Sequence, residues 1–338
     1  MNMKTESPRI LLFVPPFEAV IFPSLAVHQL EAQLRADGLS CDICYSNALY
    51  ASMIGFDLYH KISWRSPLSL LGDRIFAAYL ERAGHPGVRP GQQANLLSRM
   101  EADSDDPLAG PEGLMQCFTP EAEMDFRSAL ELVLLEREYD IVGITCGCMQ
   151  LCATEYHASI VKDLAPNCTI VIGGANCDGE MAEGILSFTR YIDHIFSGEA
   201  DYAFTEFCLN FPYSKDAGSI IRCDPVEDLS KLQPPDFSAY YSEVAKCGYP
   251  YLSTAYVPYQ SSRGCWWGQK SQCVFCGLNG ANIRYRTKPV DKLLSELPPI
   301  LQRHTSRNLM MVDCIMPNNY LTDLLPRIRD EVGYVNMF

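Results

Sequence analysis

Short apolar runs alternate with amphipathic stretches through the first two hundred residues of the chain. Five of the runs predict β-strands, at 9–14, 39–46, 140–146, 168–174 and 191–198. Amphipathic spacing predicts helices between them, at 24–38, at 154–166 and along the apolar stripe of Phe126, Leu130, Val133 and Leu134. Continuous apolar strands separated by helices are typical of a parallel sheet that helices cover on both faces. The pattern therefore predicts an α/β fold that begins with a doubly wound, Rossmann-like sheet.

One long segment breaks this rhythm between the second and third strands. Residues 47–120 are interpreted as an insertion, in which 68–80 is expected to be helical and 103–113 to be a surface loop. The insertion belongs to a first domain that we expect to span residues 1–222.

The character of the sequence changes again after Cys223. Residues 224–241 are rich in Pro, Asp and Tyr and follow neither the helical nor the strand period. Such a stretch predicts an ordered linker, which we expect at 223–252.

The last part of the chain begins a second succession of strands and helices. Residues 253–262 and 308–314 predict strands, and "VDKLLSELPPILQRH" predicts a helix that is interrupted at Pro298 and Pro299. A β/α barrel uses about 30 residues per strand–helix unit, so residues 253–338 are too few to close one. We expect the N-terminal part of such a barrel, truncated early in this second domain.

The net charge of −14 disfavours a nucleic acid as the main partner, because binding to a phosphate backbone depends on Lys and Arg. Between residues 263 and 307, however, eight Lys or Arg stand against only Asp291 and Glu296. This locally basic segment is suited to binding an acidic leader peptide.

The chain contains 15 cysteines, an odd number without a repeating framework, so we expect reduced thiols in a cytoplasmic protein. The apolar run at 9–14 is too short to cross a membrane, and no small-residue cleavage site follows it. We therefore expect neither a signal peptide nor a membrane partner.

Three cysteines lie close together in "SSRGCWWGQKSQCVFCGLNG", residues 261–280. Cys265, Cys273 and Cys276 have the spacing C-x7-C-x2-C among glycines that let the backbone wrap closely, which suits a metal ion or an iron–sulfur cluster. Structural zinc usually needs a fourth ligand, and the nearest candidates are Cys247 and His304. Three packed thiols are the remaining alternative.

The residues around these cysteines resemble those of radical SAM enzymes, in which an aromatic residue precedes the last cysteine and a glycine-rich stretch follows it. The spacing exceeds their usual C-x3-C-x2-C by four residues and, with "RGCWWG" and "CVFCGLNG", is similar to cobalamin-binding radical SAM proteins that mature ribosomally made peptides. The segments "DIVGITCGCMQ", "IVIGGANCDGEMAEG" and "IDHIFSGEAD" resemble strand motifs of their cobalamin-binding domain. "DLSKLQPPDF" resembles their linker, and "LMMVDCIMP" resembles their second barrel strand.

The resemblance implies a 4Fe-4S cluster, S-adenosylmethionine and cobalamin as cofactors. The cluster would be held by Cys265, Cys273 and Cys276. Its fourth iron would stay open for S-adenosylmethionine. S-adenosylmethionine would contact Phe275, Gly277 and Asp313. Asp313 is equally well interpreted as a helix cap.

Cobalamin would bind where the strands of the first sheet end, because ligands of parallel sheets bind at their carboxyl edge. The residues expected there are Thr145, Cys146, Gln150, Gly173, Gly174, Ala175, Asn176, Gly198 and Glu199. The Asp-x-His-x-x-Gly cobalamin signature is absent after the first strand, and His28 falls inside a predicted helix. We therefore predict no histidine ligand to cobalt and expect the 145–150 loop, with Cys146 and Met149, beneath the metal or simply packed in the core.

The activity that the resemblance implies is C-methylation of a precursor peptide at an unactivated carbon, with electrons from a flavodoxin-like or ferredoxin-like donor. A non-methylating cyclisation or rearrangement with the same cofactors is an alternative. A non-catalytic corrinoid-binding module is another. The acidic composition disfavours a tRNA-modifying enzyme, and the catalytic residues stay unassigned.

Overall fold

The computed structural model describes residues 7–64, 70–89, 113–212, 218–277, 283–304 and 306–338. A six-stranded, fully parallel sheet forms its larger part, in the order β2-β1-β3-β4-β5-β6. Its strands are β1 (Ile10–Phe13), β2 (Cys41–Cys44), β3 (Ile141–Thr145), β4 (Thr169–Gly173), β5 (His194–Gly198) and β6 (Ser219–Cys223). The five strands predicted from apolar runs are all present, so the predicted parallel α/β sheet is confirmed.

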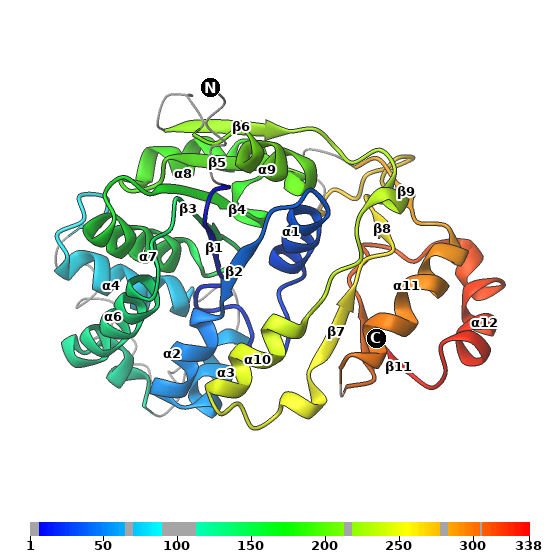
Figure 1. The fold of residues 1–338 in the computed structure, drawn as a ribbon, viewed down its shortest axis with the longest axis horizontal. Helices are drawn as coiled ribbons and strands as arrows, with labels where there is room; N and C mark the ends of the chain where they lie inside the picture. The colour runs from blue at the N-terminus through cyan, green and yellow to red at the C-terminus, as the bar shows by residue number, and fades with distance from the viewer. Residues whose placement is uncertain (1–6, 65–69, 90–112, 213–217, 278–282, 305) are drawn as a thin grey trace.

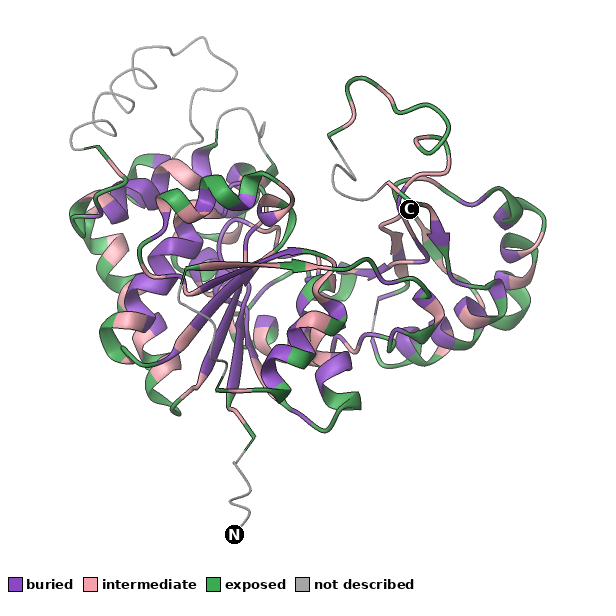
Figure 2. Cartoon of the chain, turned by 90° about the horizontal axis from the view of Figure 1, so that it is seen from above, coloured by how far each residue is buried: buried purple, intermediate pink, exposed green. Residues whose placement is uncertain are grey.

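Helices cover both faces of this sheet, whose strands are buried at the centre of the view in Figure 2. The alternation of side chains along β1 separates the faces, since Phe13 packs edge-on against His157 of α7 (Leu151–Leu164), 5.3 Å between ring centroids. Its neighbour Leu12 points to the opposite face, toward a cavity under α1 (Leu25–Ala36). Helix α9 (Ala200–Leu209) packs beside α1, and α8 (Met181–Phe188) packs against β5 and β6 (Figure 1).

The insertion between β2 and β3 is mainly helical where the structure describes it. It contributes α2 (Ser46–Ile54), α3 (Phe56–Trp64), α4 (Leu71–Arg82) and the 3-10 helix η2 (Leu114–Phe118), followed by α6 (Pro120–Leu135). Buried rings of Tyr50, Phe76 and Phe126 join these helices to one another and to α7. The helix expected at 68–80 is observed as α4, whereas residues 103–112 of the expected loop lie outside the described residues.

Three elements at the end of the first sheet and in the expected linker were not predicted. β6 is an edge strand with partly exposed residues, so its alternation is weak and the sequence did not reveal it. The expected linker contains η4 (Leu229–Lys231) and helix α10 (Ser238–Lys246), whose Tyr240 and Val244 are fully buried in the core of the first sheet. Burial of these two side chains stabilises a helix that the local composition did not indicate.

A smaller parallel sheet follows, in the order β11-β10-β7, with strands β7 (Tyr256–Tyr259), β10 (Asn308–Met311) and β11 (Asn336–Met337). Helices α11 (Val290–Gln302) and α12 (Leu324–Glu331) pack together beside it, at the right of Figure 1. The predicted interruption of α11 at Pro298 and Pro299 is wrong, because the helix runs through both prolines. Leu293, Leu297 and Leu301 bury one face of α11 against the small core, and this packing offsets the hydrogen bonds that proline cannot make.

A long loop joins β7 to α11. β8 (Ser262–Arg263) and β9 (Arg286–Thr287) form an antiparallel pair at its base, and the three clustered cysteines lie between them. No helix in the described part of the chain combines the length and apolar character that crossing a lipid bilayer requires.

Candidate functional site

A cavity of about 420 Å³ opens where β1, β3, β4 and β5 end. This is the edge at which parallel sheets bind ligands, and it includes the boundary between β1 and β3 where the strand order reverses. α1 and α9 cover the cavity on one side, and Gln260 and Arg263 reach it from the second unit. Its walls are mostly aliphatic and aromatic, with side chains such as Leu12, Leu30, Val171, Ile172, Phe196 and Phe204.

Five of the nine residues expected to contact cobalamin line this cavity. They are Thr145, Gly173, Gly174, Gly198 and Glu199. The other four, Cys146, Gln150, Ala175 and Asn176, do not line it. The sequence did not single out the α1 residues, which carry no motif, or Arg263, because in "RGCWWG" only the cysteine predicts a ligand.

Thr145 supplies an unsatisfied polar group at the cavity. Its hydroxyl oxygen Oγ1 is buried and has no hydrogen-bond partner, although its backbone carbonyl accepts a hydrogen bond from the Thr154 hydroxyl at 3.0 Å. A buried hydroxyl without a partner costs about 1–3 kcal/mol. Because this oxygen has almost no accessible surface, a ligand in the cavity would recover that free energy only if the hydroxyl turned toward it.

Gly174 allows the chain to turn closely at the end of β4. Its φ is +123°, and a Cβ there would lie 2.7 Å from the carbonyl oxygen of Cys146. Both features exclude other residues, because side chains rarely adopt this conformation and a backbone atom cannot move aside. The glycine is thus required by the packing of two adjacent loops, and a ligand gains open backbone at the same place.

Residues 146–150 are held by side-chain hydrogen bonds and do not line the cavity. The Gln150 amide donates from Nε2 to the carbonyl of Pro15 at 2.7 Å, and its Oε1 accepts from the N–H of Gly147 at 2.7 Å. Asn176 donates to the carbonyl of Gly147, and its backbone N–H donates to the carbonyl of Cys146. Gln150 and Asn176 therefore brace the loops after β1, β3 and β4.

Neither Cys146 nor His28 lies at the cavity wall. Cys146 is fully buried, and a hydrogen bond with Cys177 lowers the pKa of its thiol. The His28 ring is also fully buried, with Nε2 2.9 Å from the Tyr45 hydroxyl and the ring edge-on to Phe237. His28 is therefore a core residue of α1.

The cysteine loop presents three thiols that are each partly exposed. Cys265 begins the loop, its Sγ accepts a hydrogen bond from the N–H of Gly268 at 3.2 Å, and the N–H of Cys276 donates to the carbonyl of Cys273 at 3.0 Å. No set of three His, Cys, Asp or Glu side chains in the described residues is arranged to hold a metal ion. His304 stacks on Tyr241 at 4.6 Å between ring centroids and Cys247 packs on the first core, so each occupies another environment.

Three thiols are the donor type that an iron–sulfur cluster takes. Each thiolate of a four-iron cluster binds a different iron, so the three sulfur atoms need not converge on one centre. The N–H donated to the Cys265 sulfur is the kind of contact that adjusts the potential of such clusters.

Asp313 connects the ends of two strands of the small sheet. Its carboxylate accepts hydrogen bonds from the N–H groups of Ser261 and Ser262 and from the Ser261 hydroxyl at 2.7 Å. Burial raises the pKa of the carboxyl, and these hydrogen bonds oppose the rise. The next helical residues begin at Asn318, so Asp313 is not a helix cap. Phe275, by contrast, is 88% exposed, and Gly277 has open space on its Cβ side.

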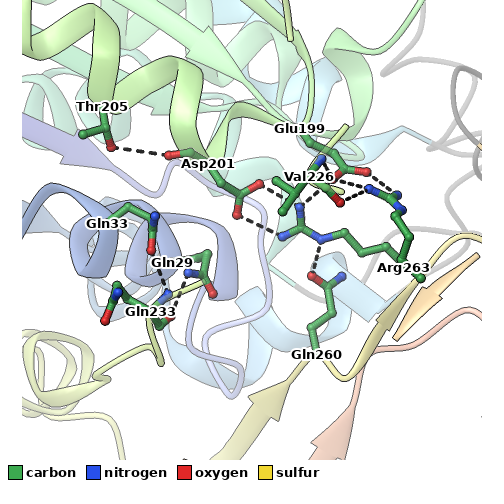
Figure 3. A network of polar contacts seen from close by, with 10 residues as sticks. Gln29, Gln33, Glu199, Asp201, Thr205, Val226, Gln233, Gln260 and Arg263 are labelled. Carbon is green, nitrogen blue, oxygen red and sulfur yellow. Dashed lines mark hydrogen bonds and ion pairs between the residues drawn. The ribbon is translucent and has the colours of Figure 1, made fainter. Parts of the chain in front are cut away.

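Arg263, two residues before Cys265, joins the two units at the cavity. Figure 3 shows its side chain between Gln260 and the carboxylates of Glu199 and Asp201. Arg286 binds the same Glu199 at 2.6 Å. Burial alone would raise the pKa of Glu199, but the hydrogen bonds from Arg286 and the charge of Arg263 hold it below its ordinary value.

No protein-family model and no curated protein matches the chain. In fold, it is similar to two structures of TsrM, a radical S-adenosylmethionine methyltransferase from Kitasatospora setae. One contains cobalamin and a 4Fe-4S cluster and matches with a TM-score of 0.54 at 12% identity, over 96% of this chain and 52% of that chain. The other, with tryptophan substrate and the analogue aza-SAM, matches with a TM-score of 0.53 at 12% identity, over 96% and 51%. The chain thus spans about half the length of TsrM, and the likeness shows a shared fold.

Proposed function

We propose that this chain binds the cofactors of a cobalamin-dependent radical SAM methyltransferase. The observation that carries the proposal is the position of the cysteine loop, which begins two residues from an arginine that lines the cavity of the parallel sheet. A cofactor in the cavity and one on the loop would therefore face the same space. The fold shared with TsrM supports the proposal, because TsrM binds cobalamin, a 4Fe-4S cluster and a SAM analogue.

The cavity fits the nucleotide tail of a corrinoid. Its volume lies within the range of about 300–1,000 Å³ that is typical of ligand sites, and apolar walls suit a flat heterocycle. The Thr145 hydroxyl offers a hydrogen bond, and the backbone at Gly173 and Gly174 is open to a sugar–phosphate linkage. In this proposal, the cavity residues hold the tail, whereas Cys146, Gln150, Ala175 and Asn176 shape the loops around it.

The loop residues Cys265, Cys273 and Cys276 are the proposed cluster ligands. When bound, the cluster and S-adenosylmethionine would together supply a carbon-centred radical, and cobalamin would supply a methyl group. The exposed Phe275 and the open backbone at Gly277 are available to pack on an adenine. Asp313 is proposed to hold the strand ends beneath this site, because its carboxylate is already committed to Ser261 and Ser262.

For the substrate we propose a ribosomally made precursor peptide that is methylated at an unactivated carbon, with a flavodoxin-like or ferredoxin-like electron donor in the cytoplasm. The sequence resemblance supports this finer assignment. The basic segment 263–307, which was expected to attract an acidic leader peptide, has less free positive charge in the folded chain than its sequence indicates. At least six of its eight cations form ion pairs with this chain's own carboxylates, so most of its charge is neutralised.

The cofactors are tested by anaerobic purification and reconstitution, followed by absorption spectroscopy. Cobalamin bands together with iron–sulfur charge-transfer bands are expected, and Cys→Ala replacement of all three loop cysteines should remove only the second set. Loss of both sets, or zinc in place of iron, contradicts the proposal.

The reaction is tested with the full-length protein, a candidate peptide, reductant, cobalamin and methyl-deuterated S-adenosylmethionine. Transfer of the deuterated methyl group to carbon, seen by mass spectrometry, supports methylation. An isomeric product without an added methyl group supports the cyclisation or rearrangement alternative. Cobalamin binding without cleavage of S-adenosylmethionine supports the non-catalytic module.

A further inference from the structure

The base of the cysteine loop, here called the neck, is a short antiparallel ladder. Ser262 pairs with Thr287 and Arg263 with Arg286, and the N–H of Cys265 donates to the carbonyl of Ile283 at 3.1 Å. The neck is closely packed, since a Cβ on Gly264 would lie 2.1 Å from the carbonyl oxygen of Arg284. The position of Cys265 therefore follows the position of the neck.

Two carboxylates at the end of β5 hold both arginines of the neck. Asp201 binds the Arg263 guanidinium through two parallel contacts, Oδ2–Nη1 at 2.7 Å and Oδ1–Nη2 at 2.9 Å. Glu199 binds Arg263 at 2.9 Å and Arg286 at 2.6 Å. One carboxylate thus joins the two strands of the neck, and a second fixes the orientation of Arg263.

These ion pairs are shielded from solvent, which distinguishes them from surface contacts. The side chains of Arg263, Arg286 and Asp201 are 15%, 5% and 7% exposed, and that of Glu199 is 18% exposed. Removing one partner of such a pair leaves a charge without compensation, whereas an exposed pair contributes little. Arg284, in the same segment, offers that comparison because its pair with Glu227 is 58% and 63% exposed.

Three of these four ionic residues also form part of the cavity wall. Glu199, Asp201, Gln260 and Arg263 all line the cavity of the parallel sheet. A ligand in the cavity would therefore lie beside side chains that hold the neck. If the ligand binds more tightly when these ion pairs are formed, it also stabilises the ion pairs and the neck that they hold. The two effects are equal, because coupling between two sites is reciprocal.

We infer that Glu199, Asp201, Arg263 and Arg286 form a clamp, which positions the cysteine loop against the cavity. Cobalamin bound in the cavity tightens this clamp. This inference rests on the proposed function for the identity of the ligand, and it assigns Glu199 to positioning rather than to a cofactor contact. Arg263 acts through the neck, so it is a positioning residue.

The first test uses hydrogen exchange, followed by mass spectrometry, in the ligand-free protein. Arg263→Lys keeps the charge but loses the two-pronged contact with Asp201, and Asp201→Asn keeps the shape but loses the charge. Each is expected to speed exchange of the neck amides about ten-fold or more. Arg284→Lys is the matched control and should leave exchange unchanged. Unchanged exchange in both clamp variants overturns the inference.

The second test adds hydroxocobalamin to the wild type and to Arg286→Lys, with the reconstituted cluster followed by electron paramagnetic resonance. Arg286 holds Glu199 but does not line the cavity. In the wild type, cobalamin should slow exchange of the neck and shift the spectrum of the reduced cluster; Arg286→Lys should bind cobalamin with neither response. Binding to the wild type without either response overturns the inference while leaving the proposed function intact. If the wild type fails to bind cobalamin, the proposed function fails, and the ligand-free comparison alone decides whether the clamp holds the neck.

Discussion

Replacing Thr145 by Val should stabilise the ligand-free protein and weaken its binding of the ligand. Val has nearly the shape of Thr and the β-branch suits strand β3, so the substitution changes little except the hydroxyl. That hydroxyl is buried at the cavity without a hydrogen-bond partner. The two effects have opposite signs because the same group is unsatisfied in the empty cavity and satisfied by a ligand.

The magnitudes follow from the cost of an unpaired polar group. Removing the hydroxyl should raise the free energy of unfolding by about 1 kcal/mol, within the range of about 1–3 kcal/mol for such a group. The loss of one hydrogen bond to the ligand should weaken cobalamin binding about five-fold to ten-fold. The backbone carbonyl of Thr145 keeps its hydrogen bond from Thr154, so the strand itself is undisturbed.

The assay combines urea unfolding of the ligand-free protein with a spectroscopic titration of cobalamin. Thr154→Val is a matched control, since this buried hydroxyl does donate a hydrogen bond, to the Thr145 carbonyl at 3.0 Å, and does not line the cavity. It should lower stability by about 1 kcal/mol and leave affinity nearly unchanged. If Thr145→Val lowers stability, or binds cobalamin as tightly as the wild type, Thr145 does not face the ligand.

Three further predictions concern stability and the loop. Burial lowers the pKa of His157 to about 4, so the unfolded chain takes up a proton at this residue before the folded chain does. The stability that the neutral ring contributes is therefore complete above pH 6.5 and is lost as the pH falls toward 4. The loss should reach about 3 kcal/mol in urea unfolding at several pH values, and His157→Gln should flatten the dependence. Gly264→Ala should prevent cluster incorporation while the first sheet folds, because its φ is +78° and a Cβ would meet the Arg284 carbonyl; normal iron content would contradict this. Glu296→Gln should cost about 3 kcal/mol by leaving Lys288 buried without a counter-ion, whereas pairing Glu296→Leu with Lys288→Met should cost much less, as a double-mutant cycle in thermal unfolding would show.

Local pattern was sufficient for the strands and helices that are apolar along a whole face. The runs at 9–14, 140–146 and 168–174 became central strands because a buried parallel strand must be apolar on both sides. The same pattern placed Thr145 and Gly173 where strands end, and hence at the ligand edge. It missed β6, which lies at the edge of the sheet and buries little.

The order of the β/α units, the edge of the sheet that holds the cavity, and the spacing of the three loop cysteines follow from the amino-acid sequence. Which polar groups at that edge are free for a ligand, and which are used internally, depends on how the chain folds. Gln150 and Glu199 read alike as ligand contacts in the sequence, yet one braces two loops and the other joins two arginines more than sixty residues away. The physical reason is that a short-range pattern records whether a residue is buried, whereas a hydrogen bond or an ion pair depends on a partner that only the folded chain brings near.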